Sequence, residues 1–152
     1  LRRATLPRVR FYNSCAVVGN SGTLRHRQHG AEIDAHDAVF RLQDAPLNNK
    51  SLSPFTGRRV TMWVRASTLH AHPSTDGKSG VALVCNQARV DGCHDGIWRH
   101  STHHARLHAI SPLFLYGVRN LTGGLIPLTG LVALMLALKS CVFLSGVTGV
   151  AL

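Results

Sequence analysis

An apolar run that ends in a glycine-bounded polar turn constrains the fold of this chain more than any other feature. Residues 15–18 read Cys-Ala-Val-Val and lead into the turn Gly-Asn-Ser-Gly at residues 19–22. A second apolar run at residues 37–42 follows a polar stretch that contains acidic residues and a histidine. A strand, a turn with free backbone N–H groups and a second strand are typical of nucleotide-binding α/β domains. The turn therefore predicts a place where a negatively charged ligand could bind.

Composition limits the chain to one globular domain. Its 152 residues suffice for a real core, and 45% hydrophobic against 16% charged residues exclude a disordered chain. It begins with Leu1 and not with Met, as we expect of a fragment. The net charge of +10 is compatible with binding to nucleic acid, to an anionic membrane surface or to an anionic substrate. It is equally compatible with a generally basic, solvated surface that binds none of these. Because no aromatic residues are interleaved with the basic ones, we expect no nucleic-acid partner.

Cysteine and histidine spacing gives no sign of a metal site. The pairing of Cys15, Cys85, Cys93 and Cys141 stays open on spacing alone. The chain contains no Cys-x-x-Cys, which argues against a zinc finger. Histidines are dense over residues 94–108, but without an organised ligand spacing. Spacing therefore predicts no metal site; that neither a metal nor a cofactor is needed is implied by the family resemblance described below.

The remaining pattern predicts alternating strands and helices. The expected strands are residues 15–19, 37–42, 59–64 and 81–84. The expected helices are a short one within residues 20–27 and a second over residues 111–121, which turns Phe114, Leu115 and Val118 inward and ends at Gly123 and Gly124. Residues 1–14 are expected to form a basic segment before the domain, which spans residues 15–152. Residues 46–57 and 70–80 are rich in turn formers and are expected to be loops, whereas residues 91–108 show no clear pattern.

The apolar stretch over residues 125–152 has two interpretations. It carries a single charge, Lys139, and is long enough to span a bilayer. Alternatively, a helix begins near Pro127, with Thr129 capping its first turn, and residues 131–138 are buried on all sides. Hydropathy alone does not separate a membrane span from a buried helix.

Taken together, these segments resemble the eukaryotic sialyltransferases, glycosyltransferase family 29. Residues 15–24, 30–37 and 40–46 resemble the long motif of that family, and residues 57–61 its continuation. Residues 110–114 are similar to the segment before the short motif, and residues 127–141 are similar to the short motif itself. The resemblance covers roughly residues 11–65 and 108–141 and is weak between them. It favours the buried helix over the membrane span.

The resemblance implies a fold, an activity and a cellular setting. The fold is an α/β, Rossmann-like sandwich resembling the GT-A variant of sialyltransferases, incomplete at its C-terminal side. The activity is transfer of sialic acid, or a related sugar, from a CMP-sugar donor to a hydroxyl of a glycan acceptor on a glycoprotein or glycolipid, with inversion and without metal. The setting is the lumenal side of the Golgi membrane, with an N-terminal anchor outside this chain.

The resemblance also implies site residues. Asn20 contacts the donor's phosphate or sugar, and Thr129 and Gly130 line the donor pocket. The complete implied donor-binding set is Asn20, Ser21, Gly22, Gln43, Thr129 and Gly130. Cys15 and Cys141 stand where the family forms a disulfide, which requires an oxidising compartment.

Three departures from the family pattern leave the activity open. Gln43 stands where the family usually has Asn, and Leu128 where it usually has Ser. Residues 142–152 are either a degraded strand or unrelated sequence. The family's base-bearing motifs follow the short motif and do not occur within these residues, and His36 is expected to be structural, so we assign no catalytic residue. An inactive remnant and a membrane-anchored protein with a span over residues 125–152 remain as alternatives.

Overall fold

A parallel six-stranded sheet forms the centre of the molecule in the computed structural model, which describes residues 12–43, 45, 47, 49–66, 80–84, 106–125 and 128–145. The strands are β1 (Tyr12–Val18), β2 (Ala38–Leu42), β3 (Met62–Ala66), β4 (Gly80–Val84), β5 (Arg106–Ala109) and β6 (Cys141–Ser145). The helices are η1 (Gly22–His26), α1 (Gly30–Ala35), α2 (Ser53–Thr56), α4 (Pro112–Leu121) and α5 (Thr129–Ser140). The strand order is β5-β4-β3-β2-β1-β6, and every neighbouring pair is parallel.

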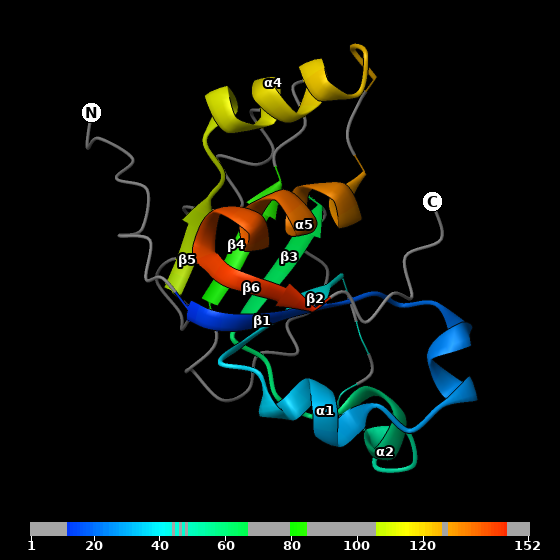
Figure 1. The fold of residues 1–152 in the computed structure, drawn as a ribbon. Helices are drawn as coiled ribbons and strands as arrows, with labels where there is room; N and C mark the ends of the chain where they lie inside the picture. Colours follow the sequence, from blue (N-terminus) through cyan, green and yellow to red (C-terminus); the bar gives the residue numbers. More distant parts are fainter. Residues whose placement is uncertain are drawn as a thin grey trace.

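Helices cover the two faces of this sheet, with α4 and α5 on one side and α1 and α2 on the other (Figure 1). Side chains of β1 alternate between the two layers. Cys15 and Val17 join the core cluster that includes α5, whereas Ala16 and Val18 join the cluster that contains η1 and α1. Residues 15–18 of the strand are buried on both faces, which explains why this part of its sequence is apolar throughout and does not alternate.

The order of the strands reverses at β1. From β1 the chain adds β2, β3, β4 and β5 on one side, and it then returns to place β6 on the other side. In open parallel sheets, ligands bind outside the carboxyl ends of the strands at such a reversal. The turn at residues 19–22 follows β1 directly and therefore lies at this position.

The expected α/β architecture is confirmed, with shifted boundaries. β1 begins at Tyr12, before the expected start at residue 15, and β3 runs from residue 62 instead of residue 59. Two short helices, α1 and α2, and strand β5 were not expected. The loop expected at residues 46–57 contains α2 at its end. Most of the loop expected at residues 70–80, and most of residues 91–108, lie outside the described residues.

Helix α4 agrees with its prediction. It buries Val118, and Phe114 and Leu115 pack against the core. The chain then turns through Gly123 and Gly124, whose φ angles of 68° and 89° belong to the left-handed region that glycine favours.

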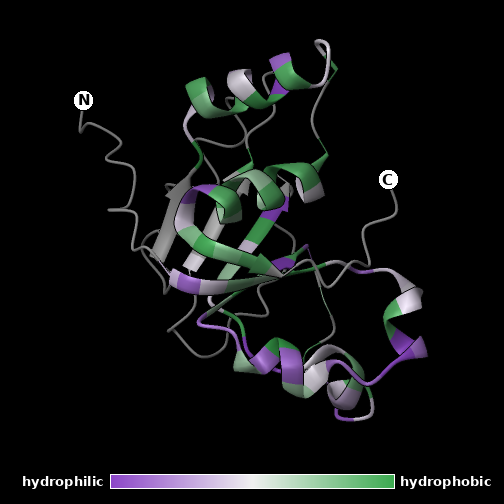
Figure 2. Ribbon diagram, in the orientation of Figure 1, coloured by the Kyte–Doolittle hydropathy of each residue, from purple (hydrophilic) through white to green (hydrophobic). Residues whose placement is uncertain are grey.

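The alternative of a membrane span at residues 125–152 is wrong. α5 has 12 residues and leads directly into strand β6. Among the described residues, none of the helices combines the length and hydropathy that a bilayer crossing needs. Figure 2 shows α5 as largely hydrophobic. It is nevertheless not buried on all sides, because Val132, Ala133 and Ala137 face the core whereas Leu138 is 53% exposed.

The expected cap of α5 is also wrong. Leu128 occupies the N-cap position and makes no side-chain capping hydrogen bond, and Thr129 is the first helical residue. The Thr129 hydroxyl instead accepts a hydrogen bond from another part of the chain, described below.

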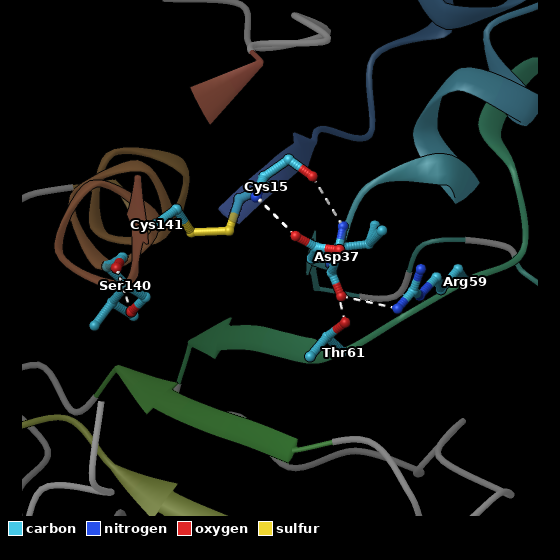
Figure 3. Close-up of a disulfide and its surroundings, with 9 residues drawn as sticks. Cys15, Asp37, Arg59, Thr61, Ser140 and Cys141 are labelled. Atoms are coloured by element: carbon cyan, nitrogen blue, oxygen red, sulfur yellow. Dashed lines mark hydrogen bonds between the residues drawn. A yellow bond between two sulfur atoms is a disulfide. The ribbon is translucent and has the colours of Figure 1, made fainter. Parts of the chain in front are cut away.

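A disulfide joins Cys15 in β1 to Cys141 at the junction of α5 and β6 (Figure 3). The two Cα atoms lie 6.0 Å apart, and the bond spans 126 positions of sequence. Beside it, the Asp37 carboxylate accepts a hydrogen bond from the Ser14 backbone N–H, and the Ser14 hydroxyl accepts one from the Asp37 N–H, both at 3.1 Å. The start of β1 is thus fixed to α5 on one side and to β2 on the other.

Candidate functional site

Asn20 links the carboxyl ends of the neighbouring strands β1 and β2. It follows β1, and its Nδ2 donates a hydrogen bond of 3.1 Å to the carbonyl oxygen of Leu42, the last residue of β2. Asn20 itself is exposed at this edge of the sheet. Its side chain therefore fixes the turn after β1 against β2 while it remains accessible to a ligand.

Gln43 connects this edge to α5. Its backbone N–H donates to the Val64 carbonyl of β3 at 3.0 Å, and its Nε2 donates to the Thr129 hydroxyl at 3.1 Å. Its φ of 45° lies in the left-handed region, where a side chain with a Cβ is uncommon. Such strained backbone tends to occur where binding sites are held in shape. These contacts connect three residues that are far apart in sequence. Asn20 is hydrogen-bonded to Leu42, Gln43 follows Leu42 in the chain, and Gln43 is hydrogen-bonded to Thr129. We call this connection the hydrogen-bonded line.

Ser21 and Gly22 complete the turn after β1. The Ser21 hydroxyl accepts hydrogen bonds from the Thr23 N–H at 3.3 Å and the Thr23 hydroxyl at 3.0 Å, so it caps η1. A Cβ added to Gly22 would meet no atom within 4 Å. Packing within the protein does not require glycine here, so Gly22 leaves open space beside Asn20. Gly130 follows Thr129 in the first turn of α5.

A pocket of about 80 Å³ opens beside this turn. Its lining comprises the turn, η1, the end of β2 and the segment up to α2, namely Val18, Gly19, Asn20, Ser21, Gly22, Leu24, Arg25, Arg41, Ala45, Leu47, Leu52 and Thr56. Sites for whole small-molecule ligands usually measure at least about 300 Å³. This pocket therefore has room for one chemical group and not for a whole ligand of that kind. The lining does not include Gln43, Thr129 or Gly130. The hydrogen-bonded line nevertheless connects Gln43 and Thr129 to Asn20, which does line the pocket.

Arg41 is the residue of this site that the sequence interpretation missed. Its side chain is 1% exposed, Nε donates to the Arg59 carbonyl and Nη2 donates to the Thr56 carbonyl, both at 2.8 Å. Desolvation by burial lowers its pKa to about 10, and the nearby Asp34 carboxylate partly opposes this. The signal was present in the sequence, because a charged residue between Phe40 and Leu42 interrupts an apolar strand.

The turn that receives Arg41 is itself firmly held. The Asp34 carboxylate accepts hydrogen bonds of 2.8 to 3.0 Å from the backbone N–H groups of Arg58 and Arg59. The Arg59 guanidinium donates to the carbonyls of His36 and Asp37, directly before β2. The family-like segment at residues 57–61 therefore fixes α1, α2 and β2 to one another and does not itself line the pocket.

His36 has the structural role expected from the sequence. It is 8% exposed, and its Nδ1 lies 2.9 Å from the Glu32 carbonyl oxygen. Within the described part of the chain, no group of three His, Cys, Asp or Glu side chains is arranged to hold a metal ion. Cys85, Cys93 and the histidines at residues 94–104 lie outside the described residues.

Comparisons with known proteins place this arrangement in context. Residues 6–72 match the family model described as glycosyltransferase family 29 (sialyltransferase). Sialyltransferase-like protein 5 of Oryza sativa subsp. japonica is 43% identical over 77 residues, which are 49% of this chain and 16% of that relative. A human relative, CMP-N-acetylneuraminate-beta-galactosamide-alpha-2,3-sialyltransferase 1, is 62% identical over 32 residues, or 21% of this chain and 9% of that protein.

The fold also matches a solved structure. The crystal structure of a mammalian sialyltransferase superposes with a TM-score of 0.76 at 21% identity, covering 89% of this chain and 54% of that one. A second structure, of a mammalian sialyltransferase in complex with Gal-beta-1-3GalNAc-ortho-nitrophenol, matches with the same values. The chain thus spans about half the length of the solved proteins and a smaller share of the curated relatives.

Proposed function

Because this chain belongs to glycosyltransferase family 29, the sialyltransferase family, we propose that it forms the donor-binding part of a sialyltransferase-like enzyme. The proposed reaction transfers sialic acid, or a related sugar, from a CMP-sugar to a hydroxyl of a glycan acceptor. The observation that supports this proposal most directly is the hydrogen-bonded line through Asn20, Leu42, Gln43 and Thr129. It lies where the order of the strands in the sheet reverses.

This line supports a phosphate site. The donor phosphate carries negative charge, and backbone N–H groups of the turn after β1 can donate hydrogen bonds to it. The amino terminus of α5 adds a positive dipole end close to Gln43, because Thr129 is its first residue. We propose that these protein dipoles, without a metal ion, neutralise the phosphate. Asn20 would contact the phosphate or the sugar, with Ser21 and Gly22 beside it and Gly130 next to the nucleotide.

The proposed chemistry is one inverting displacement. The acceptor oxygen attacks the anomeric carbon, the bond from that carbon to the phosphate oxygen breaks, and CMP leaves with the electron pair. The acceptor hydroxyl loses its proton to a general base, a contribution of about 10² to 10⁴ in rate. We assign no base among the described residues. Nδ1 of His29 lies 2.9 Å from Oε2 of Glu32, and Nδ1 of His36 lies 2.9 Å from the backbone carbonyl oxygen of Glu32.

We propose the Golgi lumen as the setting. The disulfide between Cys15 and Cys141 supports an oxidising compartment. Transfer to a glycan in that compartment is consistent with the family to which the chain belongs.

The test is whether CMP stabilises the oxidised chain. A ligand that binds only the folded state adds about 1.4 kcal/mol of stability at ten times its Kd, so thermal denaturation with increasing CMP should show a rising midpoint. Asn20→Ala should remove most of this shift. Asn120→Ala, an exposed asparagine of α4, is the matched control and should keep the full shift. A wild-type chain whose midpoint does not move with millimolar CMP would refute the proposed donor site.

The second candidate is a protein that binds the donor without transferring the sugar. It is favoured by Leu128, an apolar side chain 73% exposed beside the first turn of α5, where the family usually has serine. Incubation with a CMP-sugar distinguishes the two, because an enzyme releases CMP in the presence of an acceptor whereas a binding protein only shows the thermal shift.

A further inference from the structure

A buried positive charge lines the pocket beside Asn20. Arg41 is 1% exposed, and its two hydrogen-bond partners from Nε and Nη2 are neutral backbone carbonyls. Its remaining nitrogen, Nη1, makes no hydrogen bond to the described residues. The Asp34 carboxylate raises the pKa of Arg41, but it already accepts hydrogen bonds from two backbone N–H groups. Burying a charge without a salt bridge is costly, so the charge of Arg41 requires an explanation.

The rest of the pocket suits an anion. Arg25 of η1 is exposed and contributes a second cation to the lining. The described lining includes no acidic side chain, and about half of it is apolar, with Val18, Leu24 and Leu52 among the apolar members. An apolar wall lowers the local dielectric constant and strengthens the attraction between a guanidinium and an oxyanion.

We propose that this pocket is an oxyanion subsite, in which Arg41 from inside and Arg25 from the rim hold one anionic group of the ligand. Its volume of about 80 Å³ accommodates a single phosphate or carboxylate. This inference rests on the proposed function and deepens it, since a CMP-activated sugar acid offers both groups, the phosphate of the nucleotide and the carboxylate of the sugar. Arginine suits either one because its planar fork matches both geometrically.

A purely structural role explains Arg41 less well. Holding the carbonyls of Thr56 and Arg59 requires hydrogen-bond donors but no net charge. That turn is also already anchored by Asp34, which accepts from the backbone of Arg58 and Arg59. The buried charge therefore remains to be explained, and an anion in the pocket accounts for it.

The rim residue gives the cleaner test. Arg25→Gln and Arg27→Gln remove the same charge two positions apart, both from exposed sites, but only Arg25 lines the pocket. Binding of CMP, cytidine, N-acetylneuraminate and inorganic phosphate to the oxidised chain is followed by calorimetry and by thermal shift. We expect Arg25→Gln to weaken the binding of the anion that occupies the pocket by about two- to fivefold, as for an exposed ion pair. Arg27→Gln should leave it unchanged.

The four ligands identify the source of the anion. If the pocket holds phosphate, CMP and inorganic phosphate lose affinity in Arg25→Gln and N-acetylneuraminate does not. If it holds the carboxylate, only N-acetylneuraminate loses affinity. Cytidine, which is neutral, should bind both variants equally. Equal affinities of Arg25→Gln and wild type for all three anions would overturn the inference while the proposed function stands. The opposite outcome is also possible: phosphate binding depends on Arg25, but the chain binds CMP no more tightly than phosphate. That result would support the subsite and refute the donor site.

The buried residue is tested against a second arginine of similar burial. Arg41→Lys and Arg65→Lys both keep a charge, and Arg65 is 3% exposed but does not line the pocket. A lysine at position 41 loses the planar fork, so we expect affinity for the anion to fall by about tenfold or more. Arg65→Lys should destabilise the fold to a similar degree without this loss. If anion affinity is unchanged in a folded Arg41→Lys variant, Arg41 does not bind the anion and the inference fails.

Discussion

Reduction of the disulfide between Cys15 and Cys141 should destabilise the fold by about 3 to 5 kcal/mol. The bond closes a loop of 126 positions, and the loss of chain entropy that such a loop imposes on the unfolded state amounts to about 5 kcal/mol. Reduction adds only two hydrogen atoms, so no cavity forms around Cys15, which is fully buried. The change in stability therefore reports chain entropy almost alone.

The assay is urea denaturation of the oxidised and the reduced chain. The Cys15→Ala/Cys141→Ser double variant is the control, because reductant should no longer change its stability if this bond carries the effect. Reduction should also decrease the CMP-dependent thermal shift, since the bond holds β1 against the end of α5. Oxidised and reduced wild type that agree within about 1 kcal/mol would refute the entropy argument.

Three further substitutions test the packing around the site. Asp34→Asn should cost about 1.5 to 3 kcal/mol in urea denaturation, because its carboxylate accepts hydrogen bonds from two backbone N–H groups. Gly30→Ala should cost about 1 to 3 kcal/mol, since the new Cβ would overlap the backbone carbonyls of α2, whereas Gly117→Ala has free space and should be neutral or stabilising. The Gln43→Leu and Thr129→Val variants should each lose about 1 kcal/mol of unfolding free energy. The double variant should lose no more than either single variant, because both substitutions remove the same hydrogen bond. Additive losses would show that this bond contributes nothing to stability.

The sequence was sufficient to predict the fold class. The apolar run of residues 15–18 predicted a buried strand followed by a turn, and the structure has both, with the turn lining a pocket. These elements were predictable because strand and turn are determined locally, by a continuous apolar stretch and by glycine and asparagine. That the turn binds a ligand stays a prediction. The pairing of Cys15 with Cys141 could not come from spacing alone and depended on the family resemblance.

The features that sequence reasoning missed depend on contacts between distant segments. α1 and α2 are too short to show a clear helical period, and they form by packing on each other around Gly30. The Thr129 hydroxyl was expected to cap its own helix but instead accepts from Gln43, which is 86 positions away. The burial of Arg41 depends on carbonyls of a turn that only the fold brings to it.

Helix α5 connects the disulfide to the candidate site. The helix begins at Thr129, which is bonded to Gln43 at the carboxyl ends of the strands, and Cys141, which follows its last residue, is bonded to Cys15. Its length at about 1.5 Å per residue is roughly 18 Å, close to the roughly 17 Å that an extended chain covers at about 3.3 Å per residue from Cys15 in β1 to Asn20, two residues past the end of that strand. Because these two spans match in length, we expect the disulfide at one end to set the helix amino terminus level with Asn20. One residue inserted into α5 should shift that terminus by about 1.5 Å and rotate it by about 100°, which breaks the bond to Gln43. Such an insertion variant should therefore lose the CMP-dependent shift while it keeps the disulfide, and an unchanged shift would show that α5 takes no part in the site.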